Sequence, residues 1–138
     1  MKMYNLTITE DQARALQKAC EFLARIKIGQ VAEVVDHLPL ISGNINNRGD
    51  MIDGLEFLLK PMCGLGKNSS YGVGKFEDAD ILFDLYEVIR HRLSWDKAVA
   101  DGLAPAPDVR DWMTMITVNY DTPMHWSKTQ PLAKIVSE

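Results

Sequence analysis

The stretch that decides the fold runs from Glu77 to Asp101 and reads EDADILFDLYEVIRHRLSWDKAVAD. On a helical wheel of about 100° per residue, six of its side chains share one face, which is the spacing of a helix that packs on a core. The six residues are Ile81, Leu85, Val88, Ile89, Arg92 and Trp95. These residues therefore predict one long central helix.

Arg92 is unusual because it lies within that apolar face. A guanidinium keeps its charge, so it needs an acidic partner or a ligand. Two interpretations are open. Arg92 either pairs with Asp96 one turn further on, at the edge of the core, or lines a pocket and binds a carboxylate or phosphate.

The length and composition of the chain are those of one soluble domain. We expect a single domain over residues 1–138, with 46% hydrophobic and 25% charged residues. No apolar run reaches the roughly 18 residues of a membrane helix, and the first residues carry no secretion signal. These features favour a protein that works in the cytoplasm and does not enter a membrane.

The net charge is −4, with acidic and basic residues interspersed along the chain. A protein that binds duplex nucleic acid needs a broad basic surface, so this class of partner is disfavoured. A small anion remains possible, since a few cationic side chains and backbone N–H groups suffice to hold one.

Three shorter helices are predicted before the central one. The first spans Glu10 to Lys27 and begins with a capping box of Thr9 and Gln12. A short second helix lies within Gln30–Leu38, and a third runs from Asp50 to Leu59. On a helical wheel, the apolar side chains of the first and third helices each gather on one face, which we expect to pack on the core. They are Ala13, Leu16, Ala19, Cys20, Leu23 and Ile26 in the first helix, and Ile52, Leu55, Leu58 and Leu59 in the third.

Short strands are expected at both ends of the chain. Tyr4–Ile8 alternates, Trp112–Tyr120 is rich in β-branched and aromatic residues, and the extended tail at about 121–138 has a further short strand at Leu132–Val136. We therefore predict an α+β fold, mainly helical, with three to four helices around the long one. A small antiparallel sheet is expected to join the N-terminal and C-terminal strands.

The glycine-rich run from Gly64 to Gly74 reads GLGKNSSYGVG and leads into the central helix. It lacks the ending of a P-loop and the spacing of a dinucleotide-binding turn. Lys67, Ser70 and Tyr71 could still wrap an anion together with backbone N–H groups. The alternative is an ordinary connection between helices.

Catalytic motifs are not evident in the sequence. His37, His91 and His125 are far apart and lack the spacing of a helix-borne metal site, and no Gly-x-Ser-x-Gly motif is present. Cys20 and Cys63 are expected to be reduced thiols. We expect a protein without catalytic residues, metal or cofactor, although a hydrolase is not excluded.

Four stretches carry a resemblance to a known group of proteins. They are Gly29-Gln30, Ser70-Tyr71-Gly72, the run YEVIRHRLSW from Tyr86 to Trp95, and Asp121-Thr122-Pro123. Through them the chain resembles small phage- and prophage-encoded proteins over most of its length. The resemblance implies a phage origin and suggests an anti-defence sponge, which binds cyclic nucleotides or ADP-ribose-derived signals between subunits.

A sponge of this kind would need cationic and aromatic side chains around one pocket. We expect Arg92, Arg90 and Lys67 to hold phosphate together with Ser70, and Tyr71 and Trp126 to stack on a base. The predicted function is non-catalytic sequestration of a small anionic nucleotide-like signal by a homo-oligomer. The alternatives are a protein-binding inhibitor of a host protein, acting through the tail, and a hydrolase of such nucleotides.

Overall fold

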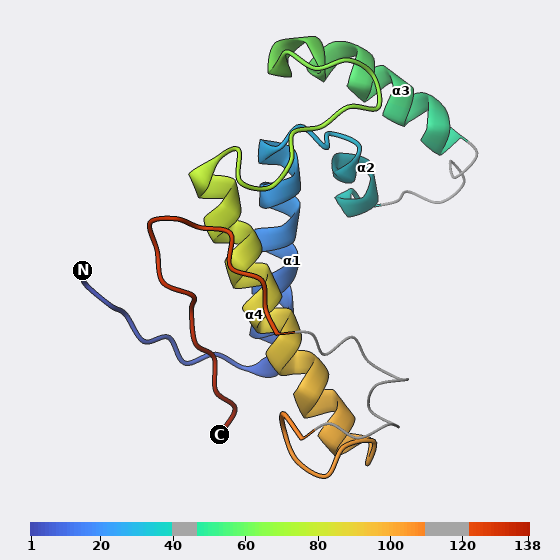
Figure 1. The fold of residues 1–138 in the computed structure, drawn as a ribbon. Coiled ribbons are helices and arrows are strands. Elements are labelled where there is room, and N and C mark those ends of the chain that lie inside the picture. The colour runs from blue at the N-terminus through green and yellow to red at the C-terminus, as the bar shows by residue number, and fades with distance from the viewer. Residues whose placement is uncertain (40–46, 110–121) are drawn as a thin grey trace.

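The computed structural model describes residues 1–39, 47–109 and 122–138, and the regular secondary structure within them is helical (Figure 1). Within them the α-helices are α1 (Glu10–Lys27), α2 (Glu33–His37), α3 (Arg48–Leu59) and α4 (Glu77–Ala100). A short 3-10 turn, η2 (Pro61–Cys63), follows α3. None of these helices is long and apolar enough to cross a bilayer.

The helix α1 begins at the predicted capping box, which is confirmed. The backbone N–H of Gln12 donates to Oγ1 of Thr9 at 3.3 Å, and the backbone N–H of Thr9 donates to Oε1 of Gln12 at 2.9 Å. Two N–H groups that have no partner inside the helix are thereby satisfied. Figure 1 shows α1 and α4 running antiparallel, side by side, as the main body of the fold.

Small side chains let α1 and α4 approach closely. Ala24 of α1 and Ala79 of α4 are fully buried, and Ile28 and Phe83 pack around them. The predicted inward face of α1 is therefore partly wrong. Ala13 and Cys20 are buried as expected, but other members of that face are exposed, namely Leu16, Ala19 and Leu23. The contact is centred on the small residues, which leaves the larger leucines at its edge.

The helix α4 has buried side chains outside the predicted face as well as on it. Val88, Ile89 and Trp95 are buried as expected. Phe83 and Leu93 are buried as well, together with two carboxylates that the apolar pattern could not show. The reason is that α4 lies between α1 and the C-terminal tail, which runs along it in Figure 1.

The predicted sheet is wrong for the described residues, which contain no strand. Tyr4–Ile8 and Leu132–Val136 are both described and have neither helical nor strand structure. The predicted strand Trp112–Tyr120 lies outside the described residues. Tyr4 is exposed, and the tail is held by side-chain acceptors of α4 instead of a strand ladder. The protein is therefore helical, and the α+β prediction is corrected.

We predict that Ala24→Leu lowers the free energy of unfolding by about 1–3 kcal/mol, because the added carbons overfill a closely packed contact. Ala19→Leu, on the exposed side of the same helix, is the matched control and should change stability by less than about 0.5 kcal/mol. Urea unfolding followed by circular dichroism measures both. Equal effects of the two substitutions would contradict the close α1–α4 contact.

Candidate functional site

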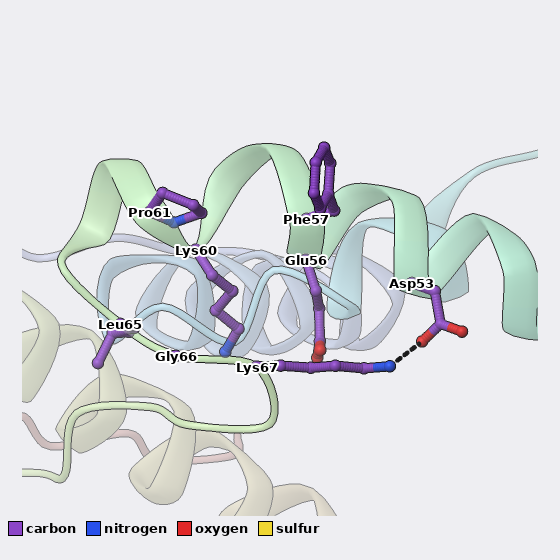
Figure 2. A pocket seen from close by; sticks show the side chains of 8 residues that line it. All are labelled: Asp53, Glu56, Phe57, Lys60, Pro61, Leu65, Gly66 and Lys67. Atoms are coloured by element: carbon purple, nitrogen blue, oxygen red, sulfur yellow. Dashed lines mark ion pairs between the residues drawn. The ribbon is translucent and has the colours of Figure 1, made fainter.

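An open groove lies between α3, η2 and the first part of the glycine-rich run (Figure 2). Its volume is about 610 Å³, within the range of roughly 300–1,000 Å³ for small-molecule sites. The residues that line it are Asp53, Glu56, Phe57, Lys60, Pro61, Leu65, Gly66 and Lys67. Of the predicted ligand-binding residues, the groove contains Lys67.

The charged side chain that builds this groove is Lys60, which is only 4% exposed. Its ammonium donates to the backbone carbonyl of Gly29 at 2.8 Å and to that of Ser69. A buried ammonium is stable only when its donors are satisfied, so Lys60 ties α3 both to the turn after α1 and to the glycine-rich run. Lys60 was not predicted as a site residue, because a single lysine just after a helix carries no pattern that indicates burial.

Gly29 has to be glycine for this arrangement. Its φ is +84°, which side chains with a Cβ rarely adopt. An added Cβ would also lie 2.4 Å from Cδ1 of Leu65. The turn therefore presents its carbonyl to Lys60 while Leu65 closes against the glycine.

Two acidic residues of α3 also face the glycine-rich run. Glu56 is buried, and Oε2 of its carboxylate accepts the backbone N–H of Asn68 at 3.3 Å. Asp53 lies 3.0 Å from Nζ of Lys67, and both side chains of this pair are more than half exposed. Exposed ion pairs contribute only about 0–1 kcal/mol, so Lys67 can exchange Asp53 for a ligand at little cost.

Figure 2 shows how these side chains are directed. Glu56 and Lys60 point from α3 towards the loop that carries Gly66, and Phe57 points to the opposite side of the helix. Phe57 therefore borders the groove without forming a stacking wall opposite Lys67. Aromatic stacking inside the groove has no evident support from the residues that line it.

The rest of the glycine-rich run is used for structure. The backbone N–H of Tyr71 donates to the carbonyl of Ile28 at 2.8 Å, and its hydroxyl donates to the carbonyl of Cys63 at 2.7 Å. The ring of Tyr71 packs edge-on against Phe76, with ring centroids 5.1 Å apart. Ser70 is exposed beside it. The structure therefore places Ser70 and Tyr71 outside the lining of the groove.

The remaining predicted ligand residues lie along α4 and the tail. Nε of Arg92 is 3.0 Å from the carboxylate of Asp96, and one terminal nitrogen is 3.6 Å from that of Asp108. Its other terminal nitrogen, NH2, is buried and has no hydrogen-bond partner among the described residues. Arg92 therefore pairs with Asp96, which is the first of the two interpretations that the sequence left open. Figure 1 shows its helix end at the far side of the fold from α3.

Arg90 and Trp126 are likewise occupied within the chain. Arg90 donates to Glu87 at 2.8 Å, and its guanidinium lies over the ring of Tyr86, 5.2 Å from the centroid. Trp126 packs on the same cluster of buried residues as Tyr71, around Ala24, Ala79 and Phe83. The predicted residues are therefore spread over three places, and the structure does not gather them around one pocket.

A second group of polar side chains holds the tail against α4, and no sequence pattern predicted it. Asp84 is buried and accepts the backbone N–H of Trp126 at 2.7 Å and that of Ser127 at 3.1 Å. One turn nearer the start of α4, Asp80 is buried and accepts the N–H of Gly74 at 2.7 Å. Carboxylates that accept backbone N–H groups are strong anchors.

Glu77 extends this row of carboxylates to the first turn of α4. It accepts the hydroxyl hydrogens of Ser127 at 2.5 Å and of Thr129 at 2.6 Å, and the backbone N–H of Lys128 at 3.1 Å. The hydrogen bonds from Ser127 and Thr129 lower the pKa of Glu77 from 4.5 to about 2. The carboxylate is therefore charged throughout the neutral range.

The same region contains a serine, a histidine and an aspartate, but not in a catalytic order. Nε2 of His125 lies 3.6 Å from Asp84 and 2.8 Å from the carbonyl of Gln130. The hydroxyl of Ser127 points to Glu77 instead of to the imidazole. A nucleophile needs its base within hydrogen-bond reach, so these residues do not form a triad. In the described part of the chain, no three His, Cys, Asp or Glu side chains could share a metal ion.

Comparison with protein-family models, with curated proteins and with solved structures finds no match to this chain.

We predict that Glu77 titrates far below an ordinary carboxyl group. A lowered pKa in the folded state means that Glu77 stabilises the fold above about pH 4.5, and that this contribution disappears as the pH falls towards about 2. Carboxyl-carbon NMR shifts give the pKa directly, and amide exchange at residues 127–129 should accelerate over the same range.

Glu77→Gln is expected to remove most of this pH dependence, whereas Glu10→Gln, an exposed carboxylate of α1, should retain it. A measured pKa near 4.5 for Glu77 would show that the tail is not held by this side chain.

Proposed function

We propose that the protein is a non-catalytic binding protein that sequesters a small anionic ligand, of the cyclic nucleotide or ADP-ribose-derived class, in the α3 groove. The observation that carries the proposal is an open groove of about 610 Å³ with Lys67 at its edge, where its ammonium makes an exposed ion pair with Asp53. On the basis of the resemblance to phage proteins, we further propose that the protein is a homo-oligomer and that it counters host defence in the cytoplasm.

The charged side chains of the groove determine which ligands can bind. Lys67 supplies the exposed cation, whereas the ammonium of Lys60 is already bound to two backbone carbonyls. Asp53 competes directly with an anionic ligand for Lys67. Binding therefore requires the Lys67 side chain to leave Asp53, and a ligand with more than one negative charge would compete best.

The absence of an assembled nucleophile and base at the groove favours capture over hydrolysis. None of the side chains that line it is a serine, cysteine or histidine. A hydrolase would have to use Asp53 or Glu56 with water, and Glu56 is already committed to the N–H of Asn68. Sequestration needs no such group, since affinity alone removes the signal.

A second candidate function, binding of a host protein, is favoured by the ends of the chain. The N-terminal segment before α1 is extended, and its Met3, Tyr4 and Leu6 are exposed. Extended apolar segments bind partner proteins by adding a strand to an exposed sheet edge. Deletion of residues 1–7 would abolish inhibition of such a partner while leaving ligand capture at the groove unchanged.

We predict that thermal unfolding in the presence of cyclic nucleotides and ADP-ribose identifies the ligand. At a hundredfold excess over its dissociation constant, the ligand should stabilise the protein by about 2.7 kcal/mol. Lys67→Ala should weaken binding about 10-fold to 100-fold, since it removes a charged hydrogen-bond donor. Lys97→Ala, an exposed lysine of α4 paired with Asp101, is the matched control.

Asp53→Asn should strengthen binding of the same ligand, because it frees Lys67 and removes a competing carboxylate. Recovery of the intact ligand after heating the complex would exclude hydrolysis. Stabilisation that is unchanged in Lys67→Ala, or no response of the native protein to any nucleotide tested, would contradict capture at this groove.

A further inference from the structure

The helix α3 is oriented opposite to an ordinary surface helix. Its polar Glu56, and Lys60 just after it, are buried against the chain, whereas its apolar Leu58 is 66% exposed. Apolar side chains of an amphipathic helix normally face the core. The predicted inward face of this helix, Ile52, Leu55, Leu58 and Leu59, is therefore wrong for Leu58 and only half-buried for the others.

The outward side of this helix carries an ordered apolar row, which we call the α3 seam. It consists of Met51, Leu55, Leu58 and Met62. Met51, Leu58 and Met62 are 50%, 66% and 82% exposed. Met62 belongs to η2, but Lys60 between the two elements has helical backbone angles, φ −59° and ψ −42°, so the row continues without a break.

The spacing of the α3 seam is that of a helix-pairing surface. Its members are separated by four, three and four residues, which is the alternation that brings a and d positions of a heptad onto one side. A row with this alternation packs along a second helix at a shallow crossing angle. The occupant that the seam fits is therefore a helix.

The order of residues in the seam specifies which helix. Read in either direction, the seam is Met, Leu, Leu, Met with the same spacings. If a second α3 lies antiparallel, about a two-fold axis level with Glu56 and Phe57, Met51 meets Met62 of the other copy and Leu55 meets Leu58. Such self-matching is what an interface between identical subunits requires.

The edges of the seam are consistent with the same pairing. In an antiparallel pair with two-fold symmetry, each edge meets the same edge of the other copy. One edge carries Ile52 and Leu59, and the other carries Gly54 and Pro61. Between Met51 and Met62 neither edge bears a charge. Arg48 lies one turn before Ile52 on the first edge, and its guanidinium is paired with Asp36 of the same chain. An added Cβ at Gly54 would have no atom within 4 Å, so this edge is open to close approach.

We propose that two copies of this chain associate through the α3 seam as an antiparallel pair. The inference rests on the homo-oligomer in the proposed function and supplies its contact surface. Asp53 and Lys60 lie on the side of α3 opposite the seam, so pairing leaves Lys67 accessible, although Pro61 borders both the seam and the groove. The seam consists of four side chains, fewer than the roughly 20–30 residues per partner of a standard interface, so we expect a dissociation constant of about micromolar or weaker.

Sedimentation velocity of the full chain between about 5 and 500 μM tests the proposal. We expect a monomer–dimer equilibrium that Leu58→Glu weakens at least tenfold. Leu23→Glu is the matched control, because it makes the same change at an exposed leucine of α1 (44% exposed), outside the seam, and it should leave association unchanged. Met62→Glu, in η2, repeats the test outside α3, and circular dichroism verifies that each variant is folded.

A cross-linking experiment tests the antiparallel geometry. Leu55→Cys and Leu58→Cys chains, both with Cys63→Ser, are mixed and oxidised. We expect the mixed disulfide to exceed both homodimers.

A native protein that is monomeric at 500 μM would overturn the proposal, as would equal association of Leu58→Glu and Leu23→Glu, or a dominant Leu55→Cys homodimer. Nucleotide-induced stabilisation in Leu58→Glu separates the two hypotheses, because groove binding does not need the seam.

Discussion

The buried ammonium of Lys60 determines how the outer part of this protein is organised. By donating to the carbonyls of Gly29 and Ser69, it fixes one side of α3 against the turn after α1 and the glycine-rich run. A lysine can be buried in this way only if backbone oxygens replace its water, and the positive φ of Gly29 supplies one of them. The groove and the exposed seam are both consequences of that orientation.

The row of carboxylates on α4 has the corresponding role in the main body. Glu77, Asp80 and Asp84 each accept N–H groups from segments that have no regular structure of their own. Side-chain acceptors on a rigid helix thereby replace the ladder of a β-sheet. This explains how the tail can be fixed to the protein without the predicted strands.

Local sequence signals predicted the helices well. Thr9 and Gln12 define the start of α1 through a capping box that needs no tertiary information, and the acidic first turn of α4 begins where its charges suit the helix dipole. The facing of the helices was harder to predict. A wheel shows where apolar residues gather, but it does not show which neighbour covers them. The prediction that Leu58 faces the core was wrong for that reason.

The candidate site was predictable only in part. Lys67 could be found because it lies in a glycine-rich run, whereas Lys60 and Asp53 enter the groove through contacts between segments that are distant in sequence. Arg92 was noticed because its charge broke an apolar pattern, and Asp96 was a foreseeable partner one turn away. Asp108, beyond the end of the helix, was not foreseeable.

The mirror-like order of residues in the α3 seam affects how such a surface can change over generations. Any replacement in this row occurs twice in a symmetric pair. It therefore changes the free energy of association at two positions, whereas it changes the stability of each chain at one. Self-association can therefore be gained or lost through a single codon, with the remainder of the molecule left undisturbed.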